Sequence, residues 1–91
     1  MNLMVTHAAV DCFQKVWGYR QGEFIRIYVR YSGGAEDAFA FGIMKDDPQN
    51  LAISYVDGGI TFFMEEKDAW YLSDRNLTID CRHDEIVFDR G

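Results

Sequence analysis

The sequence predicts a strand-rich α+β domain, and three observations support this fold class. The chain has 91 residues, of which 48% are apolar, and this suffices for one compact domain over residues 1–91. Apolar residues recur at three- and four-residue spacing near the N-terminus, which predicts a helix. From Phe24 onward they alternate in short runs separated by turn residues, which predicts mostly antiparallel strands with a few helices packed on them.

A short extended start at Val5 leads into the predicted helix. Thr6 can cap this helix, because its hydroxyl can accept a hydrogen bond from a free backbone N–H. Gly18 lies where a left-handed residue would end it. The apolar face that we expect the helix to bury consists of Ala9, Cys12, Phe13, Val16 and Trp17.

The strands are predicted from a change to a two-residue period. The run 24–31 has one apolar face, and Ser32-Gly33-Gly34 ends it. In the run 38–44 one face carries only small residues, including Gly42, which indicates close approach of another element. The further predicted elements are a strand over 51–55, a tight turn at Asp57-Gly58-Gly59, a strand over 60–64, a helix over 65–72, and strands over 77–81 and 85–89.

Composition and charge exclude several classes of function. The formal charge of −6 argues against nucleic acid, because a phosphate backbone requires a basic surface. The longest apolar run, Ala38–Met44, is much shorter than the roughly 20 residues that a membrane span needs. The first residues lack the basic start of a signal peptide, so we expect a cytoplasmic protein with reduced thiols.

The two cysteines and a nearby histidine are the candidate metal ligands. Cys81 and His83 are two residues apart on a predicted strand, so both side chains could project from one face and bind a metal ion. The alternative is that Cys81 continues the apolar face of its strand while His83 lies on the surface. Cys12 falls on the apolar helix face, where burial competes with a role as a reactive thiol.

The charged residues do not form a recognisable catalytic set. Arg26 and Arg30 share a strand face that could bind an anion, although a solvated face matched by acids is the expected interpretation. Neighbouring carboxylates such as Glu65 and Glu66 would point to opposite faces of a strand and form no dyad. We therefore predict that the protein is not an enzyme.

The order of these segments resembles the HesB-like domain, the A-type iron–sulfur cluster assembly family. The stretches that carry the resemblance are Val5-Thr6 before Ala8-Ala9, Ile25 to Gly33, Ala38 to Phe41, Asp57 to Ile60, Trp70-Tyr71-Leu72 and Leu77 to Asp80. Together they span about residues 5–88. The resemblance implies a β-rich sandwich or pseudo-barrel, iron or an iron–sulfur cluster as cofactor, and iron–sulfur assembly components as protein partners.

This chain departs from the family pattern at the cluster ligands. The family's first ligand cysteine corresponds to Gly34, and the family's later Cys-Gly-Cys motif does not occur. The resemblance therefore predicts a short member with an accessory or partner-docking role in iron–sulfur biogenesis that lacks the usual ligands. The alternative is a ligand-free protein-interaction module that keeps the fold and has lost the iron–sulfur chemistry.

Overall fold

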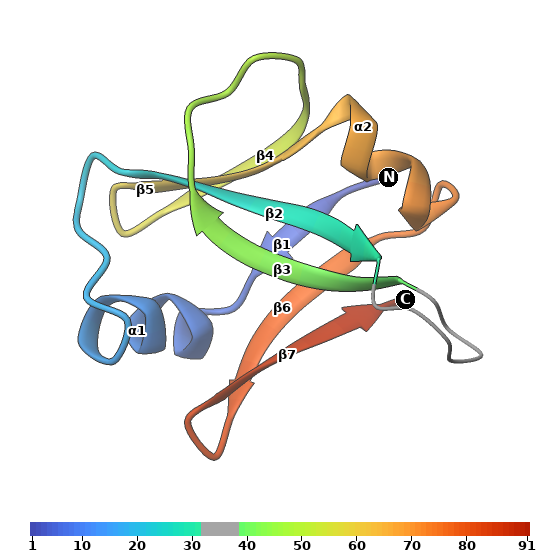
Figure 1. The fold of residues 1–91 in the computed structure, drawn as a ribbon. Coiled ribbons are helices and arrows are strands. Elements are labelled where there is room, and N and C mark those ends of the chain that lie inside the picture. The colour runs from blue at the N-terminus through green and yellow to red at the C-terminus, as the bar shows by residue number, and fades with distance from the viewer. Residues whose placement is uncertain (32–38) are drawn as a thin grey trace.

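The computed structural model describes residues 1–31 and 39–91, and Figure 1 shows their arrangement. Strands predominate, and the helices are short. The elements in chain order are β1 (Leu3–Val5), α1 (His7–Lys15), β2 (Phe24–Tyr31), β3 (Phe39–Lys45), β4 (Leu51–Asp57), β5 (Ile60–Glu65), α2 (Glu66–Ala69), the 3-10 helix η1 (Trp70–Leu72), β6 (Leu77–Arg82) and β7 (Glu85–Arg90).

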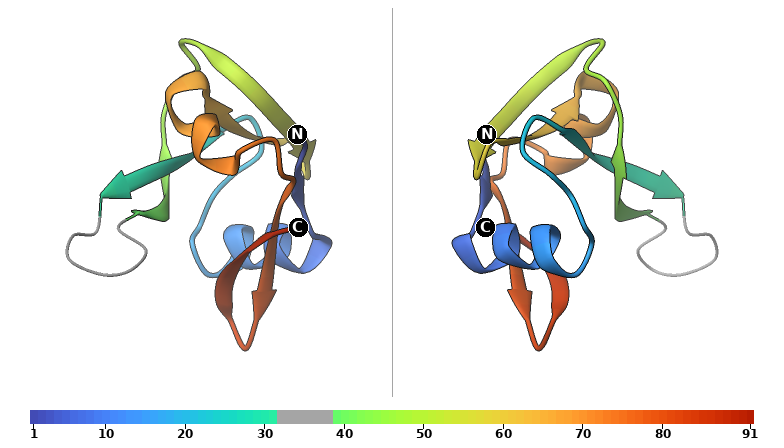
Figure 2. Two further views of the ribbon diagram at one scale, coloured as in Figure 1. Left: turned by 90° about the vertical axis from the view of Figure 1, so that its right-hand side faces the viewer. Right: turned by 90° about the vertical axis from the view of Figure 1, so that its left-hand side faces the viewer.

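The strands form two mixed sheets. One has the strand order β1-β6-β7 and the other has the order β3-β2-β5-β4. Pairing is parallel between β1 and β6 and between β2 and β5, and antiparallel in the other three pairs. The α+β class predicted from the sequence is confirmed, whereas the sheets are more mixed than the predicted antiparallel arrangement. The views in Figure 2 show the β6–β7 hairpin projecting away from the four-stranded sheet, with α1 beside it.

The hydrophobic core lies between these sheets and α1. The central strand β5 is buried along most of its length, because β2 and β4 flank it and other elements cover its faces. Phe13 of α1 contacts Phe62 of β5 with ring centroids 5.4 Å apart. The largest fully buried side chains are Phe13, Phe62, Phe63, Ile25, Ile27, Ile60, Met64, Leu72, Leu77, Ile79 and Val5.

Helix α1 begins as predicted and ends earlier than its apolar pattern indicates. The Thr6 hydroxyl accepts a hydrogen bond from the Ala9 N–H at 3.1 Å, which confirms the N-cap. The helix ends at Lys15, and Gly18 follows with a φ of 75°. The prediction that Val16 and Trp17 lie on the buried face is therefore wrong, because both follow the helix and are exposed.

Two predicted glycine roles are confirmed. The ring of Tyr28 lies over Gly42, its register partner on β3, and a Cβ there would come within 2.3 Å of that ring. Gly58 and Gly59 both have positive φ in the turn between β4 and β5, as a tight hairpin requires. The helix predicted over 65–72 is instead divided into α2 and η1, and Glu65 ends β5.

A buried ion pair joins α2 to β2. The Arg26 Nη2 lies 2.8 Å from the Asp68 Oδ2, and these side chains are only 14% and 5% exposed. The other oxygen of Asp68 accepts a hydrogen bond from the Val29 N–H at 3.1 Å, and Asp46 pairs with Arg26 at 3.2 Å. The acids expected to match Arg26 are present, but the solvated environment predicted for it is wrong.

We expect Asp68→Ala to lower the free energy of unfolding by about 3 kcal/mol, because it leaves the Arg26 guanidinium buried without its main partner. The matched control is Asp11→Ala, which removes an exposed pair with Lys15 and should cost no more than about 0.5 kcal/mol. Urea denaturation followed by circular dichroism measures both values. Equal losses in the two variants would contradict the structural role of the buried pair.

Candidate functional site

An apolar groove lies where the edges of the two sheets approach one another. In the described part of the chain, β3 and β7 each have a strand neighbour on one side only. The groove has a volume of about 400 Å³. We call it the inter-sheet groove, and its lining consists of Trp17, Phe41, Gly42, Ile43, Asp84, Glu85, Ile86 and Phe88.

Aromatic contacts connect the two sides of the groove. Phe41 of β3 and Phe88 of β7 lie with their ring centroids 5.2 Å apart. Tyr71 of η1 packs edge-on against Phe41 at 5.4 Å. Tilted and edge-on ring pairs stabilise such contacts, so these rings favour the close approach of the two sheet edges.

Trp17 and an acidic turn lie along the rim. Trp17 packs edge-on against Phe13 at 5.2 Å and remains 42% exposed. Asp84 lies in the turn between β6 and β7, and Glu85 is the first residue of β7. Both are exposed. The groove thus combines apolar walls, two sheet edges and a negative rim, which are features of surfaces that bind other proteins.

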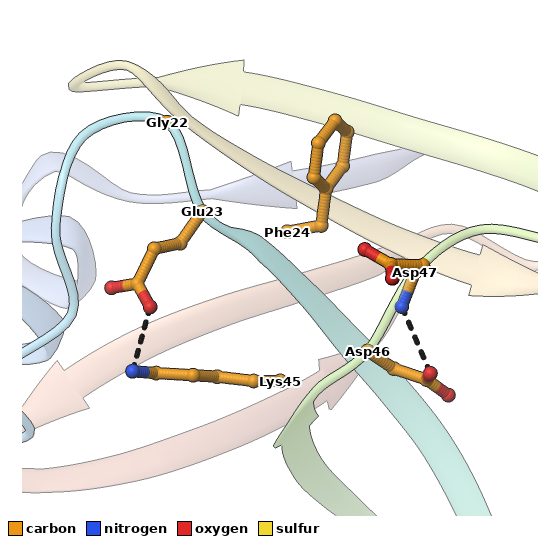
Figure 3. A pocket seen from close by; sticks show the side chains of 6 residues that line it. All are labelled: Gly22, Glu23, Phe24, Lys45, Asp46 and Asp47. Carbon is orange, nitrogen blue, oxygen red and sulfur yellow. Dashed lines mark hydrogen bonds and ion pairs between the residues drawn. The ribbon is translucent and has the colours of Figure 1, made fainter.

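A second pocket, of about 450 Å³, is polar and is shown in Figure 3. The Lys45 ammonium lies 2.6 Å from the Glu23 carboxylate, and this hydrogen bond lowers the pKa of Glu23. The Asp47 N–H donates to Asp46, whose other oxygen pairs with Arg26. Lys45 pairs with Glu23, and Arg26 pairs with Asp46. These ion pairs connect the β2 segment to the end of β3, so the pocket is better explained by a structural role than by catalysis.

The candidate metal ligands lie at the junction of α1 and β6. Cys12 is buried on α1, Cys81 is partly buried on β6, and both are free thiols. They line one cavity of about 320 Å³ together with His83, which is exposed and has a left-handed φ of 53° in the hairpin turn. The structure therefore adds Cys12 to the predicted pair of Cys81 and His83. The prediction that His83 lies on the strand is wrong, because β6 ends at Arg82.

These residues do not fit an iron–sulfur cluster. Such clusters are usually held by four cysteine thiolates, and this cavity presents two. Within residues 1–31 and 39–91, no group of three or more His, Cys, Asp or Glu side chains is placed to hold a metal ion. Gly34, the position that matches the family's first ligand cysteine, lies outside the described residues.

Sequence reasoning missed the residues that build the groove. Trp17 was assigned to the core, although the glycine after it already limits how far the helix can extend. Phe41 and Phe88 each fit an apolar strand pattern, and nothing in either strand indicates that the two edges meet. The groove depends on how the two sheets pack, which local periodicity does not report.

The fold and groove define a small strand-rich protein with a surface suited to protein binding. No family model matches the chain. It is 32% identical over 93 residues to a protein of Bacillus subtilis (strain 168) named pyruvate dehydrogenase inhibitor, with 98% of each chain covered. Uncharacterized proteins of Staphylococcus epidermidis and Staphylococcus saprophyticus are 29% and 28% identical, covering 100% and 97% of both chains.

The identity and the coverage together place this chain in a family: it belongs to the family of the Bacillus subtilis pyruvate dehydrogenase inhibitor. The similarity extends over almost the whole of both sequences, so it includes the strands that form the inter-sheet groove. Among the described residues, no helix is long and apolar enough to cross a bilayer.

Asp80 should make the junction of α1 and β6 sensitive to acid. Its carboxylate accepts hydrogen bonds from the Thr6 hydroxyl at 2.7 Å and from the Cys81 N–H at 2.8 Å, and these bonds lower its pKa. The lowered pKa means that the stabilisation is complete above the ordinary pKa of an unfolded aspartate, about 3.9. It is lost as the pH falls through the folded value.

We therefore expect Asp80→Asn to be less stable than the wild type at neutral pH, with a difference that shrinks as the pH falls below about 4. Denaturation curves across the acid range measure this difference. Asp89→Asn, at an exposed position of β7, is the matched control. A difference for Asp80→Asn that stays constant with pH would contradict this role of the carboxylate.

Proposed function

We propose that the protein is an inhibitor of pyruvate dehydrogenase that acts by binding the enzyme through the inter-sheet groove. The observation that carries this proposal is the full-length similarity to the Bacillus subtilis protein named pyruvate dehydrogenase inhibitor. Relatives that align from end to end are expected to share the fold, and therefore the surface on which such a function depends.

The chemistry of the groove favours binding over catalysis. Its polar side chains are the carboxylates of Asp84 and Glu85, which lie on the rim next to apolar residues. Catalysis by a carboxylate would need a neighbouring nucleophile, base or metal ion. Without one, these carboxylates can contribute electrostatic recognition of a partner. The exposed ring of Trp17 can instead anchor a partner, because tryptophans provide much of the binding energy at protein interfaces.

The groove also indicates the chemistry of the surface that it binds. Apolar walls accept an aliphatic or aromatic side chain, and the sheet edges β3 and β7 can accept backbone hydrogen bonds from an extended segment. The acidic rim attracts lysine or arginine, in keeping with the net charge of −6. We infer that the enzyme contributes an apolar segment flanked by basic residues.

The role inferred from the HesB-like resemblance is a second proposal. In that role the chain would dock on iron–sulfur assembly components without holding a cluster itself. The incomplete ligand set at the cysteine cavity agrees with docking and not with cluster transfer. Both proposals require a protein-binding surface, and they differ in the partner.

Titration of a pyruvate dehydrogenase from the organism that encodes this chain tests the first proposal. We expect the wild type to inhibit the enzyme, and Trp17→Ala to raise the inhibitor concentration needed by at least tenfold, since an anchoring ring is removed. Trp70→Ala is the matched control, because Trp70 is also exposed but borders a different pocket, beside Leu51 of β4. Its effect should be within about twofold.

Circular dichroism of each variant establishes that the fold persists, since Trp17 also packs on Phe13. No inhibition by the wild type would refute the proposed function. Inhibition that Trp70→Ala abolishes and Trp17→Ala leaves intact would show that the chain binds through the surface around Trp70 and not through the inter-sheet groove.

A further inference from the structure

Cys12 and Cys81 form a pair of thiols outside the proposed docking surface. They come from α1 and β6, which pack against each other, and both line the cavity at that junction. The Cys12 Sγ also lies 4.0 Å from the backbone oxygen of Asp84. Neither cysteine lines the inter-sheet groove, although Asp84 borders both the groove and the cysteine cavity.

The two cysteine side chains share one cavity and lie close enough for Cys81 to affect the pKa of Cys12. The pKa of Cys12 is raised to about 11, mainly by burial and next by the neighbouring Cys81 side chain. The backbone holds them in place, because the Thr6 N–H donates to Ile79 at 2.9 Å and the Thr6 hydroxyl donates to Asp80 at 2.7 Å. These bonds tie the start of α1 to the segment of β6 that carries Cys81.

The two thiols differ in how a reagent can reach them. Cys81 is only partly buried, whereas Cys12 is 6% exposed. An oxidant that enters the cavity therefore meets Cys81 first, with Cys12 beside it. A partly accessible thiol with a second thiol next to it is the arrangement found in redox-responsive cysteine pairs.

We propose that Cys12 and Cys81 are a reversible thiol–disulfide pair that a hydroperoxide oxidises. The Cys81 thiolate attacks one oxygen of the peroxide, so that an S–O bond forms, the O–O bond breaks, and the leaving hydroxide takes a proton to become water. The Cys12 sulfur then attacks the sulfenic sulfur. An S–S bond forms, the S–O bond breaks, and the oxygen leaves as water with the Cys12 proton.

The overall reaction converts two thiols and one hydrogen peroxide into one disulfide and two waters. Both electrons that reduce the peroxide come from the sulfur atoms. The disulfide would connect α1 near the N-terminus with β6 near the C-terminus and so close most of the chain into a loop. Because long closed loops restrict the unfolded chain, the oxidised protein should melt at a higher temperature than the reduced protein.

The test is to treat the reduced full-length protein with hydrogen peroxide, block the remaining thiols under denaturing conditions and measure the intact mass. We expect a monomer lighter by two hydrogens, with no blocked thiol and a peptide that links Cys12 to Cys81. Dithiothreitol should restore both thiols. Three results would each overturn the proposal. These are a dimer linked by disulfides, two unreacted thiols, and a wild type in which Cys81 accumulates as sulfenic or sulfinic acid while Cys12 stays free.

The single-cysteine variants separate the two steps. In Cys12→Ser, peroxide should leave a sulfenic acid on Cys81 that a dimedone probe captures, because the second thiol is missing. In Cys81→Ser, Cys12 should remain a thiol. Cys12→Ala replaces Cys12→Ser if a buried hydroxyl prevents folding, and the wild-type mass measurement depends on neither variant. Faster probe capture at Cys12 than at Cys81 would also contradict the proposed order.

Discussion

The buried ion pair between Arg26 and Asp68 fixes the arrangement on which the rest of the structure depends. It joins β2, near the centre of the four-stranded sheet, to α2. Removing either charge would leave the other buried without a partner, which strongly destabilises a fold. Glu65, directly before α2, accepts the N–H groups of Gln49 and Asn50 at 2.9 Å and so anchors the segment between β3 and β4. Two buried carboxylates thus hold this end of the sheet in place, including its edge strand β3.

The inter-sheet groove is a consequence of that arrangement. The position of β3 follows from its pairing with β2, and the position of β7 follows from its pairing with β6. The two edges meet through the rings of Phe41 and Phe88, and both edges still have one side without a strand neighbour in the described part of the chain. The junction of α1 and β6 holds the cysteine pair, and Asp84 borders both that cavity and the groove. The proposed docking surface and the proposed thiol pair are therefore neighbours at the β6–β7 turn.

Local features of the sequence predicted most of the elements, and long-range contacts explain what they could not. The Thr6 cap, the strand 24–31, the small face at Gly42 and the Gly58-Gly59 turn each depend on residues close in sequence or on backbone geometry. The partner of Arg26 is 42 residues away, on the helix that follows β5, the strand that pairs with β2. The two cysteines were likewise assigned to separate packing roles, because nothing within a helix or a strand shows that α1 and β6 place them together. The groove was missed for the same physical reason.

Hydrogen–deuterium exchange of this chain, alone and with pyruvate dehydrogenase, tests the central claim most directly. Amides of exposed sheet edges exchange readily, and a bound partner protects them. The account predicts new protection in β3 and β7 and along the β6–β7 turn, with unchanged exchange in β4. Protection confined to β4 and α2, or no change in any segment at saturating enzyme, would contradict a docking role for the inter-sheet groove.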